Sequence, residues 1–192
     1  MAQLAIHQRY QRLIRRVSSE KLSALAASEE PSATRVANDL LPLGVLLARL
    51  MMGWVFVWAG FDKLIRGFTA EGFLLNATKG PLAGWFQDIG GNTAALNVIN
   101  PMVVWGEILV GVALIFGVAT RWAAFWGAIM MLLFYAAQLP PEHNPFMEYY
   151  LVYAVLLGIL GAVGAGRILG LDAWIERQPL VRRIPGASFV LG

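Results

Sequence analysis

The chain has 192 residues, of which 58% are hydrophobic and only 14% charged, against about 25% charged in a typical soluble domain. This composition leaves too little polar surface for a soluble domain, and the formal net charge of +3 indicates no nucleic-acid partner. The absence of cysteine excludes disulfides, iron–sulfur ligation and thioether-bound haem. Because the apolar runs are continuous rather than alternating, they favour a helical membrane bundle over a transmembrane barrel.

Residues 1–38 form a polar arm whose apolar residues recur at helical spacing, at Ile6, Tyr10, Leu13 and Val17, among several arginines. This pattern predicts a basic amphipathic helix that lies on an anionic cytoplasmic leaflet. A solvated helix or a frayed arm is the alternative. We expect no cleavable signal peptide, because no apolar run of the secretory kind precedes the first span.

The first predicted span covers 43–65, and its 23 residues rise about 34 Å, enough to cross a hydrocarbon core of about 30 Å. One face of this helix carries residues at alternating steps of four and three, namely Arg49, Gly53, Phe56, Gly60 and Lys63. Lipid would reject these charges. We therefore expect the face to turn inward, with glycines where helix backbones approach closely.

The segment that follows Arg66, up to residue 100, is too polar and too rich in glycine to cross a bilayer. It contains enough apolar residues to dock on the bundle as short helices, with breaks at Lys79-Gly80-Pro81 and at Gly90-Gly91. A connection of this length in a compact protein is usually functional.

Three further spans are predicted at about 102–118, 121–139 and 146–168, the second span opening at Pro101 and the third ending at the Pro140-Pro141 pair. The fold class is thus an all-α membrane protein, a four-transmembrane-helix bundle with an extended outer loop between helices 1 and 2. The membrane domain is predicted to cover 39–174, and residues 175–192 form a cytoplasmic tail.

The basic residues set the orientation. Eleven Lys or Arg residues lie in the arm, in the turn at Arg121 and in the tail from Arg167, whereas the opposite side has three, at Lys63, Arg66 and Lys79. The positive-inside rule then places both termini in the cytoplasm of a multi-pass cell-membrane protein, with the 66–100 loop outside.

Several polar residues share one depth near the outer side of this topology. Glu107 lies about 9 Å inside the second span, at the level of Asp62, Lys63 and Glu148. We expect these residues to form one pocket with aromatic walls that opens toward the outer leaflet. Its other candidate members are Trp54, Trp58, Trp105, His143, Asn144, Tyr149, Tyr150 and Tyr153.

Each candidate also has a structural explanation. Glu107 and Lys63 could form a purely structural ion pair, and Glu148 could simply favour a helix N-terminus. The tryptophans and tyrosines could be an aromatic belt, and Arg49 is expected to reach the cytoplasmic headgroups by snorkelling. No metal site is expected, and His7 and His143 lie on opposite sides of the predicted membrane, which excludes a bis-histidine haem within one chain.

Four segments carry a family resemblance: GWVFVWAGFDKL, TKGPLAGWFQ, LPPEHNPF and GAGRILGLDAW. In this order, from about Leu40 to Trp174, they resemble the DoxX/DoxD family of four-helix membrane proteins. The resemblance implies a bundle in the cytoplasmic membrane, and the DoxD branch is named for the membrane subunit of thiosulfate:quinone oxidoreductase. Relatives have acidic and histidine residues after NPF, whereas only Glu148 keeps that character here.

The leading hypothesis is therefore a membrane subunit of a quinone-linked oxidoreductase, with a lipid quinone as cofactor and a partner subunit or a second copy beside it. Glu107, Lys63 and Asp62 would lie near the quinone head group, and Trp54 and Trp58 along its ring or tail. The alternative is a non-catalytic anchor or scaffold that holds a partner protein. A small-solute transporter is a weaker reading, because no inverted repeat with broken helices is visible.

Overall fold

The computed structural model describes residues 19–21, 32–140, 147–179, 181 and 186–192, and the chain divides into two units, 1–42 and 43–192. The arm that is predicted to be a basic amphipathic helix lies largely outside the described residues. In the part that is described, every regular element is a helix.

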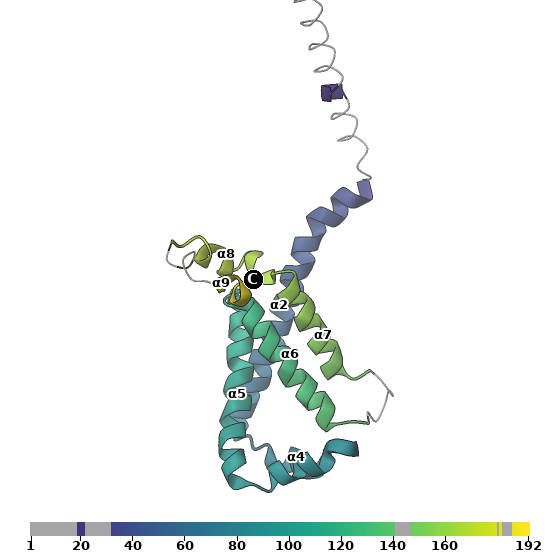
Figure 1. The fold of residues 1–192 in the computed structure, drawn as a ribbon, viewed down its shortest axis with the longest axis vertical. Coiled ribbons are helices and arrows are strands. Elements are labelled where there is room, and N and C mark those ends of the chain that lie inside the picture. The colour runs from purple at the N-terminus through teal and green to yellow at the C-terminus, as the bar shows by residue number, and fades with distance from the viewer. Residues whose placement is uncertain (1–18, 22–31, 141–146, 180, 182–185) are drawn as a thin grey trace, which may run out of the picture. The chain divides into compact units, whose positions relative to one another are not determined.

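Four helices build the bundle in the second unit. They are α2 (Ser32–Arg66, within the bundle from residue 43), α5 (Thr93–Phe116), α6 (Thr120–Ala137) and α7 (Tyr149–Ala162). Figure 1 shows α6 and α7 side by side, both inclined to α5. Three segments are long and apolar enough to cross a membrane, namely Asp39–Arg66, Thr93–Phe116 and Thr120–Ala137, and α7 is a shorter apolar helix.

The predicted start of the second span at Pro101 is wrong. Helix α5 begins eight residues earlier, at Thr93, because the Asn92 side chain accepts hydrogen bonds from the backbone N–H groups of Ala94 and Ala95, at 3.0 and 3.2 Å. This N-cap satisfies donors that would otherwise be left open at a helix start. Pro101 consequently lies inside the helix, where it removes only one backbone hydrogen bond.

The predicted fourth span, 146–168, also differs from the structure. Helix α7 ends at Ala162 because Gly164 adopts a left-handed conformation, with φ 66°, and the chain continues as the short 3₁₀ helix η2 (Ala165–Arg167). The 14 residues of α7 rise about 21 Å, less than the thickness of a hydrocarbon core.

The connection between α2 and α5 forms the predicted short helices, α3 (Glu71–Asn76), the 3₁₀ helix η1 (Gly80–Leu82) and α4 (Ala83–Gly90). The breaks predicted near Lys79-Gly80-Pro81 and Gly90-Gly91 are confirmed. Figure 1 shows α4 across one end of the bundle, with α8 (Asp172–Ile175) and α9 (Ala187–Val190) at the other. A small core attaches this connection to α5 and α6: Ala70, Leu74, Phe86, Leu96 and Ala137.

Helices α2 and α5 touch through glycines, as the inward face of α2 predicts. A Cβ atom added at Gly53 would lie 2.7 Å from Ile115 Cγ1, and one at Gly60 would lie 2.7 Å from Ile108 Cγ1. Opposite them, a Cβ atom at Gly111 would lie 2.5 Å from the backbone nitrogen of Val57. Such close approach is how helices in lipid gain packing energy without a hydrophobic drive between them.

Candidate functional site

The predicted pair of Lys63 and Glu107 is confirmed as an ion pair between α2 and α5. Lys63 Nζ donates to both carboxylate oxygens of Glu107, at 2.9 and 2.8 Å, and lies 3.4 Å from the carbonyl oxygen of Ala59. The Glu107 side chain is 3% exposed and that of Lys63 is 25% exposed. The carboxylate is therefore enclosed, while the amine retains an open side.

The glycine contacts explain why these two side chains meet. Gly60 lies three residues before Lys63, and Ile108, which it touches, is the residue after Glu107. Because the backbones of α2 and α5 approach closely at this level, an extended lysine side chain reaches the carboxylate across the helix interface.

The open side of Lys63 faces a cavity of about 270 Å³, which we call the Lys63 cavity. Helices α2, α3, α5, α6 and α7 all contribute to its wall, together with Phe68 from the turn after α2. Its lining residues are Val55, Phe56, Ala59, Lys63, Phe68, Phe73, Glu107, Met131, Phe134, Tyr149, Tyr150 and Tyr153. Its volume is slightly below the range of about 300–1,000 Å³ for sites that take a drug-sized molecule, so it suits a ring of head-group size.

Aromatic rings form most of the wall. Phe134 lies edge-on to both Phe73 and Tyr150, with ring centroids 6.4 and 5.6 Å apart, and the rings of Tyr149 and Tyr150 are 4.1 Å apart. Lys63 Nζ lies 5.6 Å from the centroid of Phe68, within the range of a cation–π contact. A flat, weakly polar ring bound here could stack on the aromatic side chains of the wall, with the Lys63 cation beside it.

Asp62 does not belong to this cavity. Its carboxylate accepts a hydrogen bond from Arg66 Nε at 2.7 Å, one turn further along α2, and both side chains are well exposed. The neighbouring position on a helix points about 100° away, so sharing a depth with Lys63 does not bring Asp62 to the same place.

The three tryptophans predicted to surround the pocket also lie elsewhere. Trp54, Trp58 and Trp105 are all more than half exposed, and none of them lines the Lys63 cavity. Trp54 and Trp58 stack on each other, with centroids 6.1 Å apart. Their positions match those of residues that face lipid in a membrane protein.

The segment at the start of α7 divides in the same way. Tyr149 and Tyr150 line the cavity as predicted, and Tyr153 joins them one turn later. Glu148 instead caps α7, since its carboxylate accepts a hydrogen bond from the backbone N–H of Tyr149 at 3.1 Å. His143 and Asn144 lie outside the described residues.

A second charge, that of Arg49, is buried at the other end of α2. Arg49 is 1% exposed, so the prediction that it reaches the headgroups is wrong. Its terminal nitrogens donate to three backbone carbonyls that follow α7, at Ala165 (2.6 Å), Ile168 (2.9 Å) and Leu169 (3.3 Å). The loop after α7 bends over the arginine and gives it the partners that water or lipid headgroups would otherwise supply.

Asp172 completes this second centre, and sequence reasoning missed it. The carboxylate is fully buried and accepts hydrogen bonds from the backbone N–H groups of Ala119, Thr120 and Gly192, at 2.7, 3.0 and 3.1 Å. It thus caps the start of α6 and lies within electrostatic reach of Arg49. A Cβ atom at Gly166 would collide with this carboxylate. The glycines that precede the aspartate in GAGRILGLD were therefore the sequence signal that the chain folds closely around a buried Asp172.

The two centres differ in what they can do chemically. Every contact described for the Arg49 and Asp172 centre is to the protein itself, and no described cavity is lined by either residue. Among the described residues there is also no group of three or more His, Asp or Glu side chains that could hold a metal ion. Of the described cavities, the Lys63 cavity is the one lined by a buried ion pair, which makes it the candidate site for a small molecule.

Comparison with known proteins gives one match. Residues 44–138 match the family model described as DoxX. This range contains α2 from Gly44, the α3 to α4 connection, α5 and α6, and hence both partners of the Lys63 and Glu107 pair. It ends before α7 and Asp172. No curated protein and no solved structure matches the chain.

Proposed function

Because the chain belongs to the DoxX family, we propose that it is the membrane subunit of a quinone-linked oxidoreductase, similar to the DoxD type, and that the Lys63 cavity binds the quinone ring. One observation carries the proposal: a lysine in a buried ion pair borders an aromatic cavity within an apolar bundle. A quinone ring is flat, accepts hydrogen bonds at its carbonyls and partitions into membranes, and this cavity is suited to each property.

The donor set fits the ring. Two of the three Lys63 N–H bonds go to Glu107 at 2.8 and 2.9 Å, whereas the third partner, the Ala59 carbonyl, lies at 3.4 Å and is a weak acceptor. That carbonyl also has its own place in the helix ladder. A quinone carbonyl oxygen on the open side of Lys63 would replace this weak contact with a charge-assisted hydrogen bond.

Glu107 has a positioning role in this scheme. Its two oxygens hold the lysine amine at the edge of the cavity, and its negative charge balances the charge of the amine in an apolar surrounding. The tyrosines and phenylalanines orient the ring and exclude water. When bound, the quinone supplies two-electron, two-proton chemistry, and Lys63 Nζ is the atom of the chain placed to hand a proton to its carbonyl oxygen.

A partner subunit, or a soluble donor, would supply the electrons, because the described side chains form no chain of redox groups. We place the cavity on the outer side, because eleven of the basic residues lie in the arm, at Arg121 and in the tail, which the positive-inside rule assigns to the cytoplasm. In this topology α7, which packs along α6, forms the fourth crossing together with the chain that continues through η2, and both termini are cytoplasmic.

The test is equilibrium binding of a short-chain benzoquinone to the purified full chain in detergent, read by quenching of its intrinsic fluorescence. We expect saturable binding to the native chain and a loss of at least tenfold in affinity in the Lys63→Met/Glu107→Gln double variant, which keeps the pair neutral. Asp62→Asn is the matched control, because it removes a charge one residue away from the cavity. No binding to the native chain would favour the anchor or scaffold alternative.

A further inference from the structure

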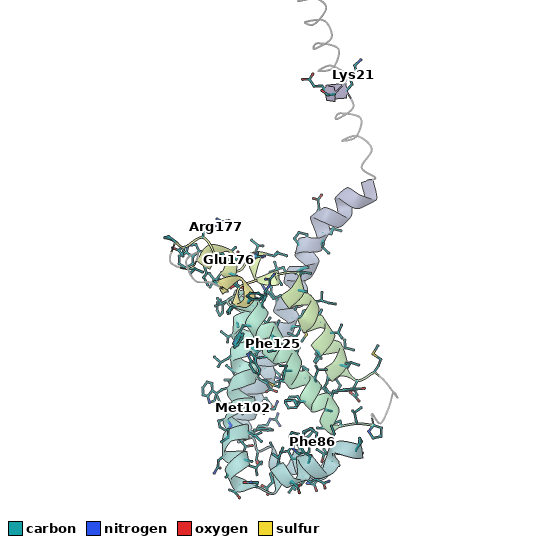
Figure 2. The ribbon with its side chains drawn as sticks, in the orientation of Figure 1. Lys21, Phe86, Met102, Phe125, Glu176 and Arg177 are labelled. Carbon is teal, nitrogen blue, oxygen red and sulfur yellow. The ribbon has the colours of Figure 1, made fainter. Side chains whose placement is uncertain are left out.

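A second cavity, of about 480 Å³, lies between α5 and α6 and reaches the helices that cross the bundle end; we call it the apolar groove. None of its lining residues is charged, and most are Phe, Trp, Leu, Ile or Met. In Figure 2, Phe86 marks its roof on α4 and Met102 its side on α5.

The apolar groove and the Lys63 cavity share two residues. Phe73 and Phe134 line both, and their rings meet edge to face with centroids 6.4 Å apart. This pair of side chains borders both the polar space at Lys63 and the apolar space between α5 and α6. A molecule with a polar end and an apolar end could therefore occupy both spaces at once.

The length of the groove is set by the helices that line it. On α5 it runs from Ile99 to Val110 and on α6 from Trp126 to Ala137, in each case about 16 Å at 1.5 Å per residue. This is about half of a hydrocarbon core of about 30 Å. The groove therefore has the depth of one leaflet, measured from the end of the bundle that holds Lys63.

The groove is closed toward the bundle end and open along its side. Phe86, which is 7% exposed, belongs to the small core that attaches α3 and α4 to the bundle. Met102 and Leu133 line the groove and are largely exposed, on the side where lipid would lie. Gly106 lines the groove and leaves it open by having no side chain. A Cβ atom at this position would lie 3.0 Å from Met130 Cε, so a larger residue would fill this space.

We infer that the Lys63 cavity and the apolar groove together hold one amphiphile, a quinone whose ring lies at Lys63 and whose alkyl or isoprenoid tail runs down between α5 and α6. The inference rests on the proposed function. The shared Phe73 and Phe134 wall and the one-leaflet depth favour a tail attached to the ring. A phospholipid fits less well, because no charged residue lines the groove and the lysine of the Lys63 cavity is already paired with Glu107.

The test compares two probes, a decyl-substituted benzoquinone and the same ring without the decyl chain, on the purified full chain. Comparing each probe between variants removes the effect of its partition into detergent. Gly106→Leu fills the groove, and Gly158→Leu adds the same bulk on α7, where a Cβ atom meets nothing within 4 Å. Leu133→Ala removes a contact with the tail at a position that is 49% exposed, so we expect it to keep the fold.

We expect Gly106→Leu to weaken binding of the decyl-substituted ring about tenfold and Leu133→Ala about threefold, while the ring without a tail binds all variants equally. Gly158→Leu should change neither probe. Unchanged affinity for the decyl-substituted ring in both groove variants would overturn the tail site but leave ring binding at Lys63 intact. Failure of both probes to bind the native chain would instead refute the proposed function, and the tail site with it.

Discussion

Helix α2 carries two inward charges four turns apart, and their surroundings have little in common. Arg49 lies within the bundle end at α8, where its terminal nitrogens bind three backbone carbonyls and Asp172 caps the neighbouring helix. Lys63 lies at the end covered by α3 and α4, where its amine pairs with the Glu107 carboxylate and borders a cavity. The comparison shows that burial of a charge does not by itself indicate a ligand site. What distinguishes Lys63 is an amine with an open side.

The largest effect is expected at the arginine end. Asp172→Ala removes the cap of α6 and the nearby negative charge of a fully buried arginine, so the free energy of unfolding should fall by about 3–5 kcal/mol. Denaturation of the purified chain in detergent, followed by circular dichroism, measures this. The chain that remains folded should still bind quinone, and a selective loss of binding with normal stability would reverse the assignment of the two ends.

The next effect is expected at the lysine end. Glu107→Gln leaves the amine of Lys63 without its partner, but because that amine is part-exposed the loss of stability should be smaller, about 1–3 kcal/mol. The Lys63→Met/Glu107→Gln double variant should recover most of this stability and still fail to bind quinone. The same denaturation measurement and the binding titration separate the two consequences, and a double variant that regains binding would contradict the account.

An effect of similar size is expected where α2 and α5 touch between the two ends. Gly60→Ala pushes a methyl group against Ile108 Cγ1 and the Val104 carbonyl oxygen, and we expect overpacking to cost about 1–3 kcal/mol. Gly158→Ala is the control, since its new methyl group meets open space. Equal stability of the two variants would show that the helices can separate without loss.

The smallest effect is expected at a surface pair near the arginine end. Arg167 donates to both carboxylate oxygens of Glu176, at 2.7 to 3.2 Å, and this hydrogen bonding lowers the pKa of Glu176. The pair therefore stabilises the fold above the ordinary pKa of a glutamate, and the contribution is lost as the pH falls through the lowered pKa. Because both groups are part-exposed, Glu176→Gln should cost no more than about 1 kcal/mol at neutral pH, with no difference from the native chain in acid.

Much of this architecture could be predicted from the sequence, because it follows from local pattern. The inward face of α2, the short helices of the connection and the Lys63 and Glu107 pair all follow from helical periodicity, glycine placement and depth. The lining tyrosines, Tyr149 and Tyr150, follow from depth as well.

The remaining features depend on tertiary contacts that depth and periodicity do not specify. Asp62 and Trp58 share the depth of the cavity but point away from it, since direction around a helix is set by the neighbours it packs against. The partners of Arg49 come from backbone carbonyls more than 110 residues away, which no side-chain pattern records. Asn92 caps the start of α5 well before Pro101, so a proline that usually marks a helix boundary lies inside this helix.

The most direct test of the central claim is a quinone titration of the native chain, the Lys63→Met/Glu107→Gln variant and the Asp62→Asn control, all at matched stability. We predict saturable binding to the native chain and the control, with at least a tenfold loss in the double variant. Equal binding by all three proteins would contradict it, because the Lys63 cavity would then have no part in holding the ring.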